Sequence, residues 1–226
     1  MTQPTPQAPS WYDISPAVSP QSAVFPGDTP WSRDTLLDWP RGDHLALSTM
    51  HGTVHVGAHA DAPVHYHRDG QAIDARDPLL YIGPCQVVRV RLPARSRIRP
   101  EHVDVQAITA PRVLFDTGSF PDPDAWRDDF TALSPELVDL LAARGVKLVG
   151  IDTPSVDPAD SKALESHQAL FAHDLAVLEG LVLSHVPAGH YVLIAPPLRL
   201  SGADASPVRA LLLHPSALAA LAPELP

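Results

Sequence analysis

The chain has 226 residues, 45% of them hydrophobic and 19% charged, a balance that predicts a globular fold with a full core. Its formal net charge of −10 argues against a nucleic acid as a partner, because an acidic surface repels phosphate. The single cysteine, Cys85, excludes an intramolecular disulfide, and no apolar run approaches the ~18 residues that span a bilayer, so we expect a cytoplasmic protein with no membrane partner.

The predicted elements begin after a short N-terminal tail. Residues 1–10 are polar and lack the basic and apolar segments of a secretory signal, so we expect a flexible tail followed by one domain over residues 11–226. Residues 11–40 mix apolar and turn-forming residues, which predicts one or two short strands and a shaped loop with a tight turn at residues 25–30. Further strands are expected at residues 44–50, 86–92, 112–115, 146–151, 177–183, 190–194 and 208–213.

Two helices are predicted in the second half of the chain. Ser134 is a good N-cap and Pro135 suits the first helical position, while Gly145 is typical of a helix end. A second helix should begin at Asp160 or Ser161 and run to about His173. Because strands outnumber helices and no ~40-residue repeat occurs, we predict an α/β fold with a mixed sheet or partly closed barrel and helices packed outside it.

The nearest thing to a basic cluster lies at residues 89–99. Its arginines alternate with other residues, which is typical of the solvated side of a strand and of the turn that follows it. This segment therefore carries no predicted role in function.

Histidines are concentrated in residues 51–67, HGTVHVGAHADAPVHYH. The polar positions of this stretch, His51, His55, His59, Asp61, His65 and His67, all have odd numbers. Residues of one parity share one face of an extended chain, so a strand running into a loop would direct all of them to one place. A helix fits less well, because Asp61 would turn about 200° from His59.

This set of residues predicts a metal site. Imidazole and carboxylate groups are the usual ligands of zinc and similar cations, and a single-metal site needs about three of them, which His55, His59 and Asp61 supply. His167 and Glu179 are candidates for a second source of ligands. On one continuous helix these two would lie about 18 Å apart, so the helix must end between them if both reach one site. A histidine-rich patch without a catalytic task remains the alternative.

Residues 55–65, HVGAHADAPVH, resemble the HxGTHxDxPxH motif of the cyclase-like metal-dependent hydrolases. The segments WYDIS at residues 11–15, FPGDTP at 25–30 and GIDTPSVD at 150–157 fit the same family in order, as does the His167 to Glu179 spacing. The resemblance extends from about residue 11 to about residue 215, and within the family it is strongest to the bacterial kynurenine formamidases. It implies a swivelling β/β/α fold and a homodimer.

The resemblance also implies a role for each candidate residue. Two Zn²⁺ ions per subunit are implied, with His55, His59 and Asp61 on the first, and with Asp61 bridging to the second, which His167 and Glu179 complete. Other divalent ions can bind such ligands. His65 matches the catalytic acid/base, and Phe25 stands where these enzymes place an aromatic side chain against the substrate. Ala58 replaces the usual Thr of the motif, and Phe25 replaces a frequent Trp.

The activity implied by the resemblance is that of an arylformamidase, which hydrolyses N-formylkynurenine to kynurenine and formate in tryptophan degradation. Water activated by the metals would attack the formyl carbon, and His65 would carry the proton to the departing amine. Two alternatives remain open at this stage: a hydrolase of cyclic amides such as isatin, and a metal-binding protein without catalysis.

Overall fold

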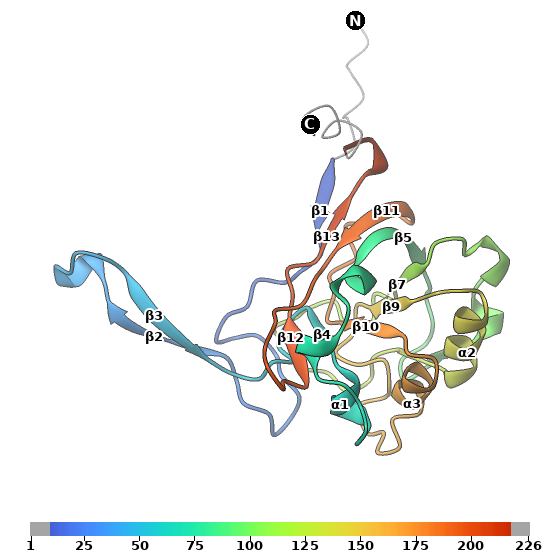
Figure 1. Cartoon of the computed structure of the whole chain (residues 1–226), viewed down its shortest axis with the longest axis horizontal. Coiled ribbons are helices and arrows are strands. Elements are labelled where there is room, and N and C mark those ends of the chain that lie inside the picture. The colour runs from blue at the N-terminus through green and yellow to red at the C-terminus, as the bar shows by residue number, and fades with distance from the viewer. Residues whose placement is uncertain (1–9, 218–226) are drawn as a thin grey trace, which may run out of the picture.

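The computed structural model describes residues 10–217, and strands from both ends of this range join one curled sheet (Figure 1). Nine strands follow the order β1-β13-β11-β5-β7-β9-β10-β4-β12. Their bounds are β1 Trp11–Asp13, β4 His59–Asp61, β5 Ile82–Arg89, β7 Arg112–Asp116, β9 Leu148–Ile151, β10 Ala176–Glu179, β11 Gly189–Ile194, β12 Ala205–Pro207 and β13 Leu211–Leu213. Two small sheets join β2 Ser32–Leu37 to β3 Leu47–His51, and β6 Arg97–Ile98 to β8 Ala132–Leu133.

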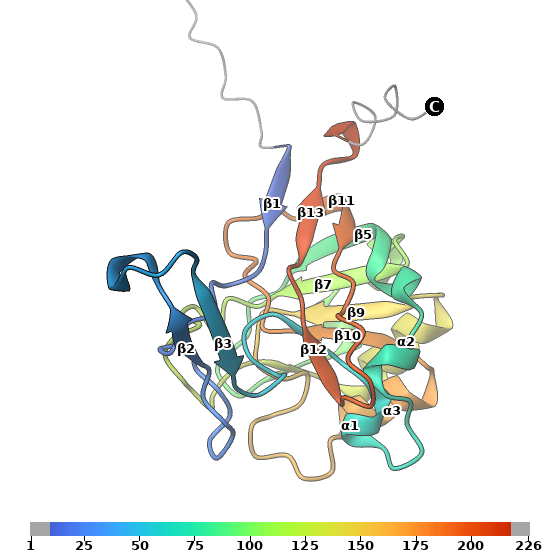
Figure 2. The same ribbon diagram turned by 60° about the vertical axis from the view of Figure 1, so that its left-hand side comes forward.

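The large sheet is mixed, as predicted. Strands β5, β7, β9 and β10 form a parallel block, and antiparallel strands continue the sheet on both sides of it. Strands β7, β9 and β10 are mostly apolar and are buried at every position, as expected for strands that are covered on both faces. Figure 2 shows the sheet curling around one side and the helices standing outside it. The predicted α/β fold with a partly closed barrel, and its cyclase-like arrangement, are confirmed.

Two hydrophobic cores lie on opposite faces of the parallel block. Helices α2 (Pro135–Ala143) and α3 (Glu165–Ala172) cover one face, where Val113 and Phe115 are fully buried. Leu114, between them in sequence, belongs to the other core. This alternation follows from the two-residue period of a strand. The predicted cap of α2 is confirmed, since the hydroxyl of Ser134 accepts a hydrogen bond from the backbone N–H of Leu137.

The start predicted for the second helix is wrong by four or five residues. α3 begins at Glu165, and the chain between Pro158 and Leu164 forms turns, in which the backbone N–H of Leu164 donates to the hydroxyl of Ser161. The carboxylate of Asp157 accepts the first free N–H groups of α3, from Ser166 and His167, at 3.0 Å. Because this capping residue lies eight residues before the helix begins, and not directly in front of it, the local sequence does not reveal where α3 starts.

Several strand boundaries also differ from the prediction. β10 ends at Glu179 instead of continuing to residue 183, because Gly180 has a φ of +65°, in the left-handed region. The strand predicted at residues 208–213 is shorter, at Leu211–Leu213, and β12 was not foreseen.

A two-stranded arm projects from the body of the molecule (Figures 1 and 2). It consists of β2, the short 3₁₀ turn Trp39–Arg41 and β3, which pair antiparallel. We call residues 32–51 the arm. The strand predicted at residues 44–50 is therefore real, but it belongs to the arm and not to the main sheet.

Some predictions lie outside the described residues. The N-terminal tail was expected at residues 1–10, of which 1–9 are not described, and neither are 218–226. The division into this tail and one domain therefore stays a prediction. Within residues 10–217, the structure contains no helix with the length and apolar character needed to cross a membrane.

Candidate metal centre

Three of the predicted ligands come from two neighbouring strands of the sheet. β4 runs antiparallel to β10, with His59 opposite Glu179 and Asp61 opposite Val177. Because alternate residues share a face, the side chains of His59, Asp61 and Glu179 lie on one face, and all three are buried. Ala60 points away into a hydrophobic core.

His55 reaches this face from a turn that precedes β4. Gly57 in this turn has a φ of +61°, which glycine adopts without strain. A Cβ atom on Gly180 would stand 2.1 Å from the carbonyl oxygen of Gly57, so only a glycine lets the turn approach the end of β10. The strand running into a loop that was predicted for residues 51–67 is therefore only partly right: the strand is short, His59–Asp61, and a short helix follows it at Pro63–Tyr66. The parity argument holds only for His59 and Asp61.

Pro63 begins the short helix α1 (Pro63–Tyr66), which carries His65 back toward the centre. The two outermost histidines of the stretch lie elsewhere. His51 is on the arm, with its Nε2 3.3 Å from the carboxylate of Asp34, and the ring of His67 stacks on Phe171 at 3.7 Å between centroids. Neither belongs to the centre.

His167 arrives from the first turn of α3. Its Nδ1 lies 2.9 Å from Oδ2 of Asp157, so the Nδ1–H donates there and Nε2 is turned toward Asp61 and Glu179. Asp157 is itself held by Arg97, whose Nη1 donates to Oδ1 at 2.9 Å. Helix α3 ends at Ala172, and Glu179 lies on the strand β10 that follows it. This break is what the sequence analysis required for His167 and Glu179 to reach one site.

The five predicted ligands converge. The closest distances are 2.9 Å from His55 Nδ1 to Asp61 Oδ1, 3.4 Å from His59 Nε2 to both Asp61 Oδ1 and Glu179 Oε2, and 3.4 Å from His167 Nε2 to both Asp61 Oδ2 and Glu179 Oε1. Besides His55, His65 and Asp204 at the edge of the centre, two sets of three among these five ligands have ligand atoms within 4.8 Å of one another: His55, His59 and Asp61, and Asp61, His167 and Glu179. The two sets share Asp61.

Several atoms of this cluster are buried without a well-formed hydrogen bond to any described residue. They are Nε2 of His59, both carboxylate oxygens of Asp61, and Nε2 of His167. Burying polar atoms unpaired is costly, and lone pairs of imidazole and carboxylate directed at one another are the donor set that divalent cations take. The residues present therefore fit one or two divalent cations.

The electrostatics of the cluster agree with this. Burial alone would lower the pKa of His55, but the carboxylates of Asp61 and Asp204, each 2.9 Å from a ring nitrogen, raise it to about 9. Burial alone would raise the pKa of Asp61, but His167 and His55 hold it well below its usual range. In the bare protein, imidazolium protons thus supply the positive charge that the buried carboxylates need.

His65 stands at the edge of the centre. Its Nε2 lies 4.0 Å from Asp61 Oδ2, and its Nδ1 lies 3.5 Å from Asp204 Oδ2. Its ring centroid is 4.3 Å from that of His55. About a third of the side chain is exposed, 35%, so the imidazole is accessible to small molecules.

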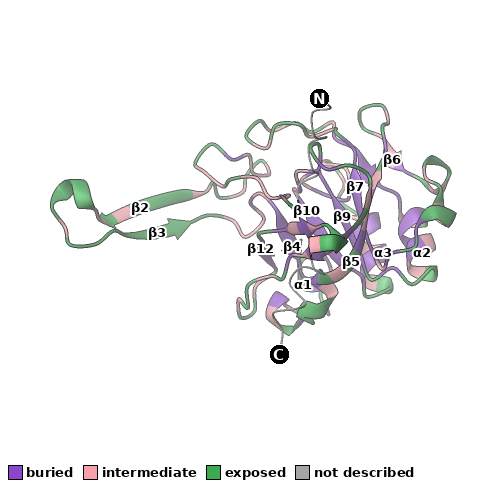
Figure 3. Cartoon of the chain, turned by 90° about the horizontal axis from the view of Figure 1, so that it is seen from above, coloured by how far each residue is buried: buried purple, intermediate pink, exposed green. Residues whose placement is uncertain are grey.

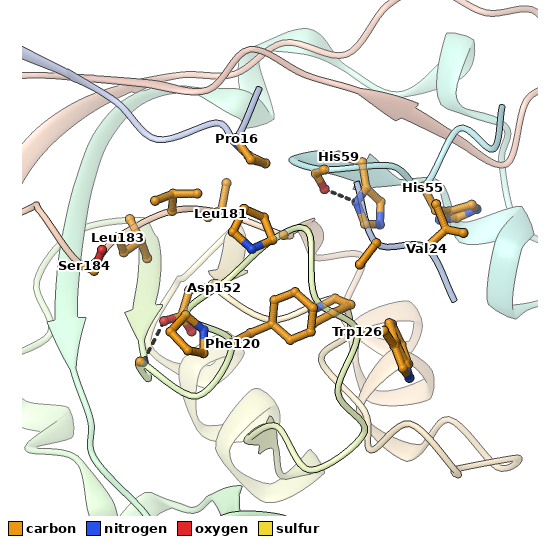
Figure 4. A pocket seen from close by; sticks show the side chains of 18 of the residues that line it. Pro16, Val24, His55, His59, Phe120, Trp126, Asp152, Leu181, Leu183 and Ser184 are labelled. Carbon is orange, nitrogen blue, oxygen red and sulfur yellow. Dashed lines mark hydrogen bonds between the residues drawn. The ribbon is translucent and has the colours of Figure 1, made fainter. Parts of the chain in front are cut away.

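A cavity of about 280 Å³ adjoins the centre at the carboxyl ends of the parallel strands (Figure 4). The segments that follow β5, β7, β9 and β10 all contribute to it, which is where ligands bind in open parallel sheets. His55 and His59 lie at one side of it, and Asp152 and Ser184 at the other (Figure 4). His65 is not among the residues that line it.

Aromatic side chains form part of the cavity wall. Phe25 is one of them, and its ring packs on Trp126 with centroids 4.6 Å apart. Phe120 and Trp126 come from the loop after β7 and were not predicted. Trp31, which follows the turn at residues 25–30, does not line the cavity.

Two further acids were missed by the sequence analysis. Oδ2 of Asp204 lies 2.9 Å from Nε2 of His55, and Asp157 orients His167 as described. Asp157 is the last residue of the GIDTPSVD segment, so the family resemblance could have indicated it. Asp204 stands in a loop with no distinguishing pattern, and it reaches the centre only because β12 pairs with β4.

Comparison with known proteins agrees with these findings. Residues 12–158 match the sequence profile of a family described as “Putative cyclase”. A solved structure of a potential metal-dependent hydrolase with cyclase activity is similar, with 27% identity over 89% of this chain and 96% of that one and a TM-score of 0.78.

Two further solved structures are similar. A predicted metal-dependent hydrolase from Bacillus stearothermophilus shares 28% identity, over 89% of this chain and 97% of that one, with a TM-score of 0.71. Isatin hydrolase A from Labrenzia aggregata, bound to benzyl benzoate, has 22% identity over 90% and 93% of the two chains and a TM-score of 0.74. At that identity, the last likeness concerns the fold alone.

Proposed function

The chain belongs to the cyclase family, and from this premise we propose that it is a metal-dependent hydrolase of amide bonds. The observation that carries the proposal is the convergence of His55, His59, Asp61, His167 and Glu179 on one buried place with unsatisfied ligand atoms. Two solved structures with 27% and 28% identity over 89% of this chain are described as potential or predicted metal-dependent hydrolases, which supports the same activity.

We propose two divalent cations, and Zn²⁺ as their identity. His55, His59 and Asp61 would hold one, and His167 and Glu179 the other, with Asp61 shared because it belongs to both sets. The hydrogen bonds from Nδ1 of His59 to the carbonyl of Gly57 and from Nδ1 of His167 to Asp157 support this assignment, since each leaves Nε2 free to ligate. When bound, such cations polarise a carbonyl and lower the pKa of water.

His65 would supply acid/base chemistry to this centre. Its Nε2 faces Asp61 while its Nδ1 faces Asp204, so Nδ1–H is held toward the carboxylate and Nε2 can take a proton at the centre. The same nitrogen would return the proton to the departing amine. Asp204 thus acts as a positioning residue through His65 and His55.

For the substrate we propose N-formylkynurenine, an aryl formamide, so that the reaction would be that of an arylformamidase. The aromatic wall of Phe25, Phe120 and Trp126 suits an aryl ring, since aromatic groups gain from edge and offset contacts with one another. The motif resemblance points to the same substrate. A cyclic aryl amide such as isatin is the rival, because an aromatic wall would accept it as well.

The test is hydrolysis by protein loaded with Zn²⁺. Release of formate from N-formylkynurenine is measured beside ring opening of isatin, and bound metal is counted in the same sample. We expect about two equivalents of metal and a clear preference for the formamide. A preference for isatin would show that the substrate is a cyclic amide and not the formamide. Bound metal without turnover of either compound would support a metal-binding protein without catalysis.

The role of His65 has a matched control two residues away. His65→Ala should keep its metal and lose most of its turnover, about a hundredfold or more. His67→Ala removes an imidazole that stacks on Phe171 outside the centre, so it should retain activity. Full turnover in His65→Ala would show that the proton is carried by another group.

We also propose that two copies of the chain form a homodimer, as the resemblance implies. The arm supports this proposal. It carries exposed apolar side chains, among them Leu36, Trp39 and Met50, with exposures of 54%, 63% and 70%. A two-stranded ribbon is marginally stable in water, and exposed apolar groups on such a ribbon favour burial against a partner.

A further inference from the structure

The cavity beside the candidate metal centre presents one well-exposed charged side chain, that of Arg91. Arg91 follows β5, and half of its side chain, 50%, is exposed. It lies on the side of the cavity that holds Asp152. Gly118 connects the two, because a Cβ there would stand 3.1 Å from Cζ of Arg91 while its backbone N–H donates to Asp152 at 2.7 Å. Figure 4 shows Asp152 across the cavity from His55 and His59.

The guanidinium of Arg91 is held in one orientation. Its Nη2 donates to both carboxylate oxygens of Asp116, at 3.0 and 3.1 Å, and its Nη1 donates to the main-chain carbonyls of Val90 and Asp116. Its Nε–H has no acceptor among the described residues. A guanidinium fixed in this way loses little conformational freedom when it binds an anion.

Asp116 does not neutralise the arginines around it. This fully buried carboxylate also accepts a hydrogen bond from Nε of Arg89 at 2.6 Å, so two guanidinium groups share one acid and a positive charge remains. The basic residues 89 and 91, expected to be merely solvated, are thus anchored to a buried acid.

Asp152, the other ionisable side chain on this side of the cavity, already accepts hydrogen bonds from the protein with both of its carboxylate oxygens. Oδ1 accepts from the hydroxyl of Thr117 at 2.6 Å, and Oδ2 accepts from the backbone N–H groups of Thr117 and Gly118. Burial raises its pKa, and only 6% of the residue is exposed. The charge that a ligand meets on this side of the cavity is therefore that of Arg91.

We infer that Arg91 binds a carboxylate carried by the substrate on the side away from the bond that is cleaved. The substrate class is then an aryl amide with an anionic side chain, in preference to a neutral aryl amide or a neutral cyclic one. This inference rests on the proposed function and deepens it. The amino-acid side chain of N-formylkynurenine carries such a carboxylate, and formanilide and isatin do not.

The experiment compares substrates within each variant. Arg91→Met is measured against Arg89→Met, which removes the other guanidinium from Asp116 but lies outside the cavity wall. We expect Arg91→Met to lower kcat/KM for N-formylkynurenine about ten- to a hundredfold, mainly through KM, and to leave formanilide within about twofold. Arg89→Met should leave the ratio of the two substrates unchanged, and Arg91→Lys should restore part of the preference.

A binding measurement separates this inference from the proposed function. L-kynurenine, the product, is titrated into metal-free protein, and its dissociation constant should rise at least about tenfold in Arg91→Met. If the parent protein hydrolyses neither formamide, the proposed function fails, while the titration still tests Arg91. If both formamides are cleaved and the ratio between them is the same in the parent and in Arg91→Met, the carboxylate site is wrong and the hydrolase stands.

Discussion

The candidate metal centre and the arm differ in burial, as Figure 3 shows for the strands that carry them, and they also differ in polarity. In the centre, ionisable side chains such as Asp61 and His167 are 2% exposed. On the arm, large apolar side chains such as Trp39 and Leu36 are more than half exposed. A folded chain normally does the reverse, because buried charge and exposed apolar surface both cost free energy.

This contrast fits the two proposals made above, a metal centre and a homodimer. In the centre, Nε2 of His59, Nε2 of His167 and both carboxylate oxygens of Asp61 are buried without a well-formed hydrogen bond to any described residue, so cations would complete it. On the arm, Leu36, Trp39 and Met50 are left exposed by the part of the chain that the structure describes, and a second copy would cover them. Four experiments test these two proposals.

The largest effect should follow from removing one negative charge from the centre. Glu179→Gln keeps the shape of the side chain but weakens a ligand, so turnover should fall at least about a hundredfold and about one equivalent of metal should be lost. Glu165→Gln, on the exposed side of α3, is the matched control and should keep both. A Glu179→Gln protein with full metal content and full turnover would contradict the assignment.

Removal of the metals should be the next largest effect. A ligand present at about a thousand times its dissociation constant stabilises the folded state by about 4 kcal/mol, which corresponds to roughly 8–16 °C in Tm for a chain of this size. Thermal unfolding before and after chelation measures the difference. In Asp61→Asn, which loses the acid shared by both sets, chelation should shift Tm much less. An identical Tm with and without chelator in the parent would contradict a buried metal centre.

Polar substitutions on the arm should weaken association without unfolding the chain. Leu36→Ser combined with Trp39→Ser should raise the dimer dissociation constant at least about a hundredfold, because buried aromatic anchors dominate interfaces. Stability of the monomer should change by less than about 0.5 kcal/mol, since both side chains are exposed in it. Sedimentation and light scattering measure the first quantity, and chemical denaturation of the dilute protein measures the second.

The control for the arm is another exposed leucine outside it. Leu79 is 65% exposed near the start of β5, and Leu79→Ser should leave the association unchanged. A parent protein that stays monomeric at about 100 µM, well above the dissociation constants of stable dimers, would contradict the reading of the arm.

The smallest effect concerns a buried ionisable group that has no acid beside it. Burial raises the pKa of Cys85 to about 12, from an ordinary value of 9.0. As pH rises above 9, the thiol of the unfolded chain ionises while that of the folded chain does not, so stability is lost between pH 9 and 12. The unfolding free energy of the parent relative to Cys85→Ala should fall by about 1.4 kcal/mol by pH 10.

Unfolding at pH 8 and pH 10 under reducing conditions measures this change. A constant difference between the parent and Cys85→Ala would show that Cys85 is hydrated in the folded state. This result complements the experiments on the metal centre. It measures the effect of burial on an ionisable group without the neighbouring histidines that offset the burial of Asp61.

Much of the local structure could be read from the sequence alone. The caps of α2 were predictable because Ser134, Pro135 and Gly145 act on backbone groups within a few residues of themselves. The pairing of His59 with Asp61 was predictable for the same kind of reason, since two residues at spacing two share a face of any strand. Parity had already grouped His65 with these residues, and the resemblance added its role, the roles of His167 and Glu179, and Phe25 as a further site residue.

What the sequence could not supply are the contacts made by pairing over long distances along the chain. The register of β10 against β4 places Glu179 opposite His59, and that of β12 against β4 brings Asp204 to His55. The approach of the loops after β5 and β7 sets Arg91 and Trp126 around one cavity. Strand pairing and packing depend on the whole sheet, so local sequence determined the chemical groups of this protein, and only its tertiary structure decided which of them meet.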